Sequence, residues 1–201
     1  INFESERANQ IDFYLGTHFD HLEIVINPFI NQISNYIYKS PTGQIDTTSR
    51  LDIFDMKQTD ATFSGGDIAF HYHPHIAHWL HLESNLSLLT NQDELPFIPQ
   101  NRLNNTIKID LKKENKLNVK NIRAQYIHFF KQDNVATYET TSPAYELINL
   151  GIIGSFNEKL NYSFGVNNLL NRNYIDHLSR LKTYDIPNPG RNIYFKISLR
   201  I

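Results

Sequence analysis

The chain has 201 residues, of which 40% are hydrophobic and 12% aromatic, and its formal net charge at pH 7 is -2. This composition excludes a disordered chain and a basic nucleic-acid-binding protein. Because the chain has no cysteine, it also excludes a disulfide framework and a thiol nucleophile. No run of about 18 apolar residues predicts a transmembrane helix. A transmembrane β-barrel is not excluded, because its strands alternate apolar and polar residues and need no long apolar run.

Apolar and polar residues alternate along most of the chain, and this alternation places the apolar side chains on one face of a β-strand. The last strand shows it most clearly, because every second residue from Ile193 to Ile201 is apolar. We predict no helix and nine strands, at residues 8–17, 21–38, 63–73, 77–89, 102–112, 118–132, 144–156, 160–171 and 191–201. Most run about 10 to 15 residues, and a tilted membrane-spanning strand needs about 9 to 11.

The connections between these strands alternate in length along the chain. Short connections are expected at residues 18–20, 74–76, 113–117 and 157–159, and long ones at 39–62, 90–101, 132–143 and 172–190. Short turns at one end of the sheet and long loops at the other are typical of an outer-membrane barrel. A soluble antiparallel sandwich also alternates and is the alternative fold. Charged residues at inward positions, such as Glu23, Lys196 and Arg200, favour a wet barrel lumen.

Several short motifs add information beyond the alternation of apolar and polar residues. They are NYIY (35–38), TDATFSGGDIAF (59–70), LPFIPQNR (95–102), YELINLG (145–151), VNNLLNRNY (166–174) and PGRNI (189–193). In this order they resemble the C-terminal part of a TonB-dependent outer-membrane receptor, and the resemblance covers nearly the whole chain. Ile201 departs from the aromatic residue with which the family usually ends.

The resemblance implies an all-β, antiparallel transmembrane barrel of about 22 strands, closed by an N-terminal plug. Residues 1–201 would then be about nine C-terminal strands of that barrel, without the plug domain. The implied function is TonB-dependent uptake of a scarce nutrient across the outer membrane of a Gram-negative bacterium. The partners would be outer-membrane lipid, the TonB complex through an N-terminal part outside this chain, and a small-molecule ligand. No nucleic-acid partner and no cofactor are expected.

Histidines are concentrated in the segment HYHPHIAHWLH at residues 71–81. Imidazole is a common ligand of zinc, copper and iron, and we name His71, His81 and Glu83 as candidate metal ligands. Residues 74–76 are expected to form a turn, which would place His71 directly opposite His81 on the lumen face and His78 on the lipid face. The alternative is that these histidines contact only the plug or water.

The last long loop carries the candidate ligand contacts Asp176, His177 and Arg180. Loops on a rigid scaffold often hold binding residues, although this loop could also serve folding alone. Ser179 lies near Asp176 and His177, but no nucleophile-elbow pattern surrounds it, and we predict no enzymatic activity. A soluble binding module and a small outer-membrane barrel enzyme are the alternative functions. The ligand could be a metal chelate, a metal ion, haem, cobalamin or a glycan.

Overall fold

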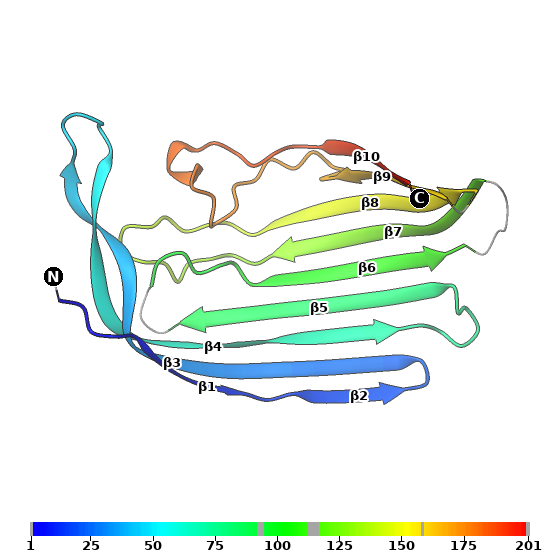
Figure 1. The fold of residues 1–201 in the computed structure, drawn as a ribbon, viewed down its shortest axis with the longest axis horizontal. Helices are drawn as coiled ribbons and strands as arrows, with labels where there is room; N and C mark the ends of the chain where they lie inside the picture. Colours follow the sequence, from blue (N-terminus) through cyan, green and yellow to red (C-terminus); the bar gives the residue numbers. More distant parts are fainter. Residues whose placement is uncertain (1, 92–94, 112–116, 158, 200–201) are drawn as a thin grey trace.

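The computed structural model describes residues 2–91, 95–111, 117–157 and 159–199, and it shows one antiparallel sheet whose strand order follows the chain (Figure 1). A short 3₁₀ helix, η1 (Lys182–Tyr184), lies in the last loop. None of the described helices is long and apolar enough to cross a lipid bilayer. The strands are β1 (Arg7–Asp12), β2 (Leu15–Phe19), β3 (Leu22–Ile45), β4 (Asp52–Tyr72), β5 (Leu80–Asn91), β6 (Arg102–Asp110), β7 (Leu117–Phe129), β8 (Tyr145–Phe156), β9 (Leu160–Asn167) and β10 (Asn192–Leu199).

Strands β1 and β2 form a single span of the sheet. Their pairing with β3 keeps one register, with Asp12 opposite Phe29 and Leu15 opposite Ile26. Between them the Phe13 N–H donates to the Pro28 carbonyl at 3.0 Å, and Pro28 has no N–H with which to return the bond. A single proline therefore interrupts the ladder without shifting it. The described sheet accordingly has nine spans in chain order, as the alternation predicted.

The β3–β4 hairpin is much longer than the sequence predicted. Residues 39–62 were expected to form a loop, yet the two strands pair from Tyr36 and Thr59 outward to Ile45 and Asp52. This outer part, the β3–β4 arm (residues 35–60), projects beyond the other strands (Figure 1). Pro41 is tolerated there because the arm is a two-stranded ribbon, in which a missing donor need not break a ladder to a third strand. The loop prediction is therefore wrong for most of this segment.

Cross-strand register separates an apolar face from a polar face. One apolar row runs through Leu82, Ile107, Ala124, Leu150, Val166 and Ile193, each opposite the next. A polar row runs through Glu23, His71, Glu83, Thr106, Gln125 and Asn149. Ile107 is 49% exposed although strands flank it on both sides. In the described residues no second sheet covers this apolar face, so the soluble sandwich alternative is wrong.

The two ends of the sheet differ as the connection lengths predicted. Short connections follow β2, β4 and β8 at one end, and the arm and the long loops gather at the other (Figure 1). We call these the turn end and the loop end. The turn predicted at 113–117 lies outside the described residues apart from Leu117, and so does Ile201.

Buried apolar residues gather at the loop end instead of forming a layer between sheets. Leu95 and Ile98, from the loop after β5, pack with Ala61 of β4 and are 2%, 5% and 3% exposed. Phe63 and Leu89 contact this cluster, and the register places both on the polar face of the sheet. The loop after β5 therefore covers these two apolar side chains on the polar face.

Candidate functional site

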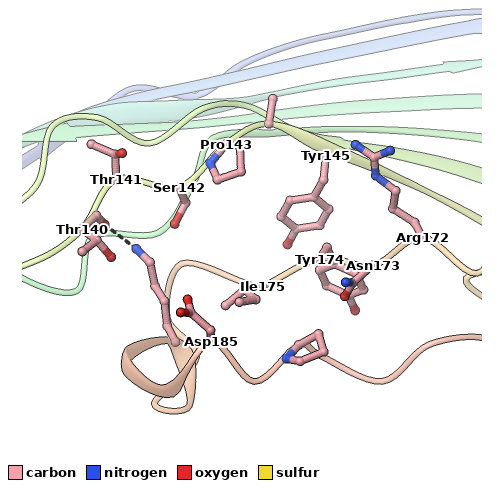
Figure 2. A pocket seen from close by; sticks show the side chains of 13 residues that line it. Thr140, Thr141, Ser142, Pro143, Tyr145, Arg172, Asn173, Tyr174, Ile175 and Asp185 are labelled. Atoms are coloured by element: carbon pink, nitrogen blue, oxygen red, sulfur yellow. Dashed lines mark hydrogen bonds between the residues drawn. The ribbon is translucent and has the colours of Figure 1, made fainter.

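Two loops at the loop end enclose a pocket of about 510 Å³ on the polar side of the sheet. Residues 140–145 form one wall, and residues of the loop after β9 form the other. Figure 2 shows Tyr145 and Tyr174 lying one above the other between the loops, with Arg172 beside them. Arg172 and Lys182 give this lining two cations, and Asp185 gives it one carboxylate.

Glutamine side chains fix the first wall. Gln132 and Ser142 pair across the loop through backbone hydrogen bonds of 2.9 and 2.8 Å. The Gln132 side chain donates to the Ile98 carbonyl at 3.0 Å, and the Gln100 side chain donates to the Phe130 carbonyl at 2.6 Å. These bonds satisfy carbonyl groups that lie outside the strands, and they join the loop after β7 to the loop after β5.

Asn168 shapes the start of the second wall. Its backbone has a φ of 51°, in the left-handed region where asparagine is among the favoured residues. Its side chain accepts a hydrogen bond from the Arg172 N–H at 2.7 Å and donates to the Arg172 carbonyl at 2.8 Å. Asn168 is only 4% exposed. One side chain therefore closes the turn that directs Arg172 toward the pocket.

Stacked aromatic rings connect the sheet to the second wall. The Phe129 and Tyr145 rings lie 4.5 Å apart at an interplanar angle of 16°, and Tyr145 stacks on Tyr174 at 4.6 Å and 27°. The Tyr145 hydroxyl also donates to the Asp176 carboxylate at 3.0 Å. Asp176, predicted as a ligand contact, is therefore already engaged in holding its loop against β8.

His177 lies at the junction of the two walls and is 5% exposed. Its Nδ1 is 3.0 Å from the Ser142 hydroxyl and 3.1 Å from the Lys182 ammonium, which also donates to the Thr140 carbonyl. An ammonium can only donate, so Nδ1 accepts and the proton of the neutral ring lies on Nε2. That Nε2 is buried and has no hydrogen-bond partner among the residues that the structure describes.

The sequence-predicted loop residues thus occupy different positions. The structure brings Asp176 and His177 together with residues of the first wall, whereas Arg180 is exposed and lies outside the pocket lining. The sequence pattern did not indicate Arg172 or Tyr174 as site residues. Both belong to the motif VNNLLNRNY, and this motif was the one sequence feature that could have pointed to them.

At the turn end, the histidine pairing differs from the predicted register. His71 lies opposite Glu83 and not opposite His81, because two successive turns, Ala77 N–H to Pro74 O and Leu80 N–H to Ala77 O, delay the start of β5 to Leu80. This also leaves His78 in the turn and not on the lipid face.

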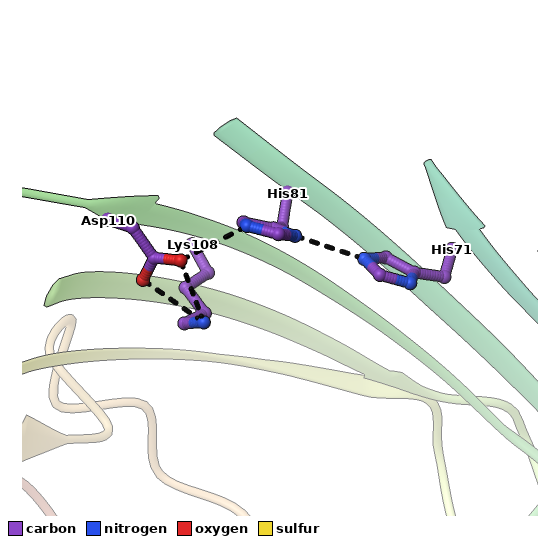
Figure 3. Close-up of polar contacts among 4 residues, drawn as sticks. All are labelled: His71, His81, Lys108 and Asp110. Atoms are coloured by element: carbon purple, nitrogen blue, oxygen red, sulfur yellow. Dashed lines mark hydrogen bonds and ion pairs between the residues drawn. The ribbon is translucent and has the colours of Figure 1, made fainter. Parts of the chain in front are cut away.

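His71 and His81 are nevertheless in contact, diagonally across β4 and β5. Figure 3 shows a chain of polar contacts from His71 Nε2 to His81 Nδ1, at 3.1 Å, and from His81 Nε2 to the Asp110 carboxylate, also at 3.1 Å. Lys108 pairs with the same carboxylate at 3.0 Å. Among the described residues, no three His, Cys, Asp or Glu side chains already converge on a common metal position.

A family model for the β-barrel of TonB-dependent receptors matches residues 1–169. The chain belongs to the TonB-dependent receptor β-barrel family. Receptors of this family reside in the outer membrane of Gram-negative bacteria and are transporters, so this chain belongs to that membrane and the enzyme alternative is wrong.

Solved structures of two metal transporters and a siderophore receptor share the fold. The copper transporter OprC matches with a TM-score of 0.80 and 17% identity over 96% of this chain and 31% of its own. The siderophore receptor PirA from Acinetobacter baumannii matches with a TM-score of 0.68 and 13% identity over 98% of this chain and 32% of its own. The FrpB iron transporter (F5-1 variant) from Neisseria meningitidis matches with a TM-score of 0.72 and 13% identity over 97% of this chain and 32% of its own. The receptor chain described here thus spans about a third of the length of these proteins.

The buried His177 predicts that acid loosens the loop of this TonB-dependent receptor. Burial and the Lys182 ammonium lower the pKa of His177, although Glu139 and Asp176 oppose this shift. As pH falls below the ordinary histidine pKa of 6.5, the open loop takes up a proton that the closed loop does not, and the closed form loses stability. We expect faster hydrogen exchange of residues 174–188 at about pH 5.5 than at about pH 7.5, after correction for intrinsic rates.

His177→Gln provides the control for this pH dependence. Glutamine keeps an acceptor for Lys182 but does not titrate, so its exchange rates should change less with pH than those of the unaltered protein. Exchange that stays constant or slows in acid in the unaltered protein would contradict the assignment of a neutral, buried His177.

Proposed function

We propose that the complete protein containing these residues is a TonB-dependent importer of an anionic metal chelate. Residues 1–201 form the C-terminal portion of its barrel wall, the apolar face contacts outer-membrane lipid, and the loop end faces the exterior. The plug and the segment that contacts TonB belong to other parts of such a receptor. The family membership and the open, two-faced sheet support this proposal.

The lining of the pocket at the loop end is the reason for proposing an anionic chelate as the ligand. Its lining combines the Arg172 guanidinium with stacked tyrosines, and a guanidinium binds carboxylate or catecholate oxygens through paired hydrogen bonds. Lys182 is held by Thr140 and His177, whereas the Arg172 side chain is exposed. A siderophore receptor and an iron transporter with the same fold are in keeping with a chelated metal. A bare metal ion, haem, cobalamin and a glycan are the other ligands to be tested.

Within this proposal the three predicted loop residues have different roles. Asp176 and His177 position the second wall through Tyr145 and Ser142 and need not touch the ligand. Arg180, which the sequence suggested as a direct contact, is exposed on the same loop as Arg172. Arg180 therefore provides a matched comparison of the same residue type in the same loop.

The test compares Arg172→Ala with Arg180→Ala in cells that express the complete receptor. Binding and uptake are measured with labelled ferric siderophores, haem, cobalamin, free metal ions and oligosaccharides, each with and without functional TonB. We expect TonB-dependent uptake of a ferric siderophore. Arg172→Ala should weaken its binding about 10-fold to 100-fold, because a hydrogen bond to a charged group contributes about 1.5 to 3 kcal/mol.

Two results would overturn parts of this proposal. Uptake that is equally fast without TonB would contradict a TonB-dependent importer. A larger loss of binding in Arg180→Ala than in Arg172→Ala would move the ligand contact out of the pocket and support the sequence-based prediction. Unchanged heat-modifiable migration of both variants on gels would show that neither substitution prevents barrel folding.

A further inference from the structure

Six histidine rings gather at the turn end of the sheet, and we call them the histidine cluster. They come from the connection between β2 and β3, the end of β4, the following turn and the start of β5. Neighbouring rings in the cluster have centroids 5.0 to 6.0 Å apart. The members are His21, His71, His73, His75, His78 and His81. So many imidazoles within contact distance have no role in the pocket at the opposite end of the sheet.

Three of these rings form a triangle whose dimensions approach those of a metal site. The centroid distances are 5.4 Å for His71 to His81, 5.7 Å for His71 to His73 and 6.0 Å for His73 to His81. With metal–nitrogen bonds of about 2.0 to 2.1 Å in a tetrahedral site, imidazole centroids lie about 5.2 Å apart and ligand nitrogens about 3.3 Å apart. The observed 3.1 Å between His71 Nε2 and His81 Nδ1 is close to that separation.

Asp110 supplies a second, independent feature of a metal site. A metal-bound histidine almost always donates its other ring N–H to a carboxylate, a carbonyl or water, and this bond fixes the tautomer and the ring orientation. His81 has this arrangement, because its Nε2 lies 3.1 Å from the Asp110 carboxylate while its Nδ1 points to His71. Lys108 pairs with the same carboxylate at 3.0 Å.

Carboxylates on the same polar row make the location favourable for a cation. Glu23 and Glu83 lie directly opposite His71 on the two neighbouring strands, where paired Cβ atoms are about 4.5 to 5.5 Å apart. Both carboxylates are on exposed residues. Glu83 is thus placed to complete a tetrahedral set after a side-chain rotation, and such rotations at exposed positions take picoseconds to nanoseconds.

We propose that His71, His73 and His81 bind one divalent transition-metal ion, such as Zn²⁺, at the turn end of the polar face. Glu83 supplies the fourth ligand, and Asp110 orients His81. Imidazole and carboxylate ligands suit zinc, nickel and copper better than calcium or magnesium. The ion joins β4 to β5 and, through Asp110, to β6. This site is separate from the loop-end pocket and does not depend on which ligand the receptor imports.

The test uses the complete receptor purified in detergent, with Zn²⁺ measured by competition against a chromophoric chelator. We expect the His71→Ala/His81→Ala variant to bind one zinc ion fewer than the unaltered receptor. The matched control is His75→Ala/His78→Ala, which removes two exposed histidines of the same turn and should keep that ion. Co²⁺ provides a second readout, because a tetrahedral site gives intense visible absorption that only the first variant should lose.

A milder substitution tests the site in case the double variant does not fold. Asp110→Asn leaves the three histidines in place and should weaken zinc binding about 10-fold to 100-fold, the usual cost of losing such a carboxylate. Heat-modifiable migration on gels confirms that each variant is folded. The proposal is overturned if the unaltered receptor and the His71→Ala/His81→Ala variant bind equal numbers of zinc ions, or if the His75→Ala/His78→Ala variant loses the ion as well.

Discussion

Replacing Ile68 with lysine is expected to lower the free energy of unfolding of the complete barrel in lipid by about 2 to 4 kcal/mol. Ile68 is 40% exposed and lies on the apolar face of β4, between Ile26 and Leu86 of the neighbouring strands. If that face contacts hydrocarbon, the ammonium has no water and no partner within reach at this depth. Guanidinium titration of the barrel in phospholipid vesicles measures the change.

Ala69→Lys is the matched control for this prediction. Ala69 is the next residue of β4, at nearly the same depth but on the polar face, where it lines a shallow depression with Glu23, His71 and Glu83. A lysine at this position reaches two carboxylates and water, so its cost should be below about 1 kcal/mol. Equal destabilisation by the two lysines, or a larger effect at residue 69, would contradict the assignment of the two faces.

Asn168→Ala is expected to open the loop after β9 and to speed its cleavage by trypsin about 30-fold. The substitution removes both hydrogen bonds to the Arg172 backbone and places alanine at a φ of 51°. The unpaired backbone groups and the left-handed conformation together should cost about 2 kcal/mol. Arg172, Arg180 and Lys182 are cleavage sites within the loop, and the rate of cleavage in the folded, purified receptor measures how often the loop opens.

Two other substitutions test whether the faster cleavage comes from the lost hydrogen bonds of Asn168 or from the loss of any asparagine side chain in the loop. Asn168→Asp keeps the acceptor for the Arg172 N–H but loses the donor, and it should give an intermediate rate. Asn173→Ala changes an exposed asparagine in the same loop and should leave the rate unchanged within about twofold. Cleavage of Asn168→Ala at the rate of the unaltered protein would show that Asn168 does not hold the loop.

The strands could be predicted because a β-strand in a barrel wall carries a local, period-two signal. Each residue from Ile193 to Leu199 faces one side or the other regardless of its partner strand, so alternation alone identified β10. The β3–β4 arm was missed because its sequence has proline, glycine and threonine in the composition of a loop. In a two-stranded ribbon the constraints that exclude such residues from a sheet interior do not apply.

Register and site geometry depend on contacts that no single segment reveals. The His71–His81 contact was expected, but the turn between them adds residues that move Glu83 opposite His71. His177 was recognised as a functional candidate, but its burial depends on Ser142, which lies 35 residues earlier in the chain. Long-range hydrogen bonds of this kind follow from the folded loops and leave no periodic trace in the sequence.

The β3–β4 arm has a consequence for how such receptors diverge. Within the described residues, β3 pairs only with β4 from Tyr36 outward. Strand β1 pairs with β3 as far as Ser34, and β5 pairs with β4 from Phe63. Residues beyond Ser40 and Asp55 can therefore be inserted or deleted in matched pairs without moving a hydrogen bond of the barrel wall. Evolution can lengthen, shorten or exchange the tip of this arm while the sheet below it keeps its register.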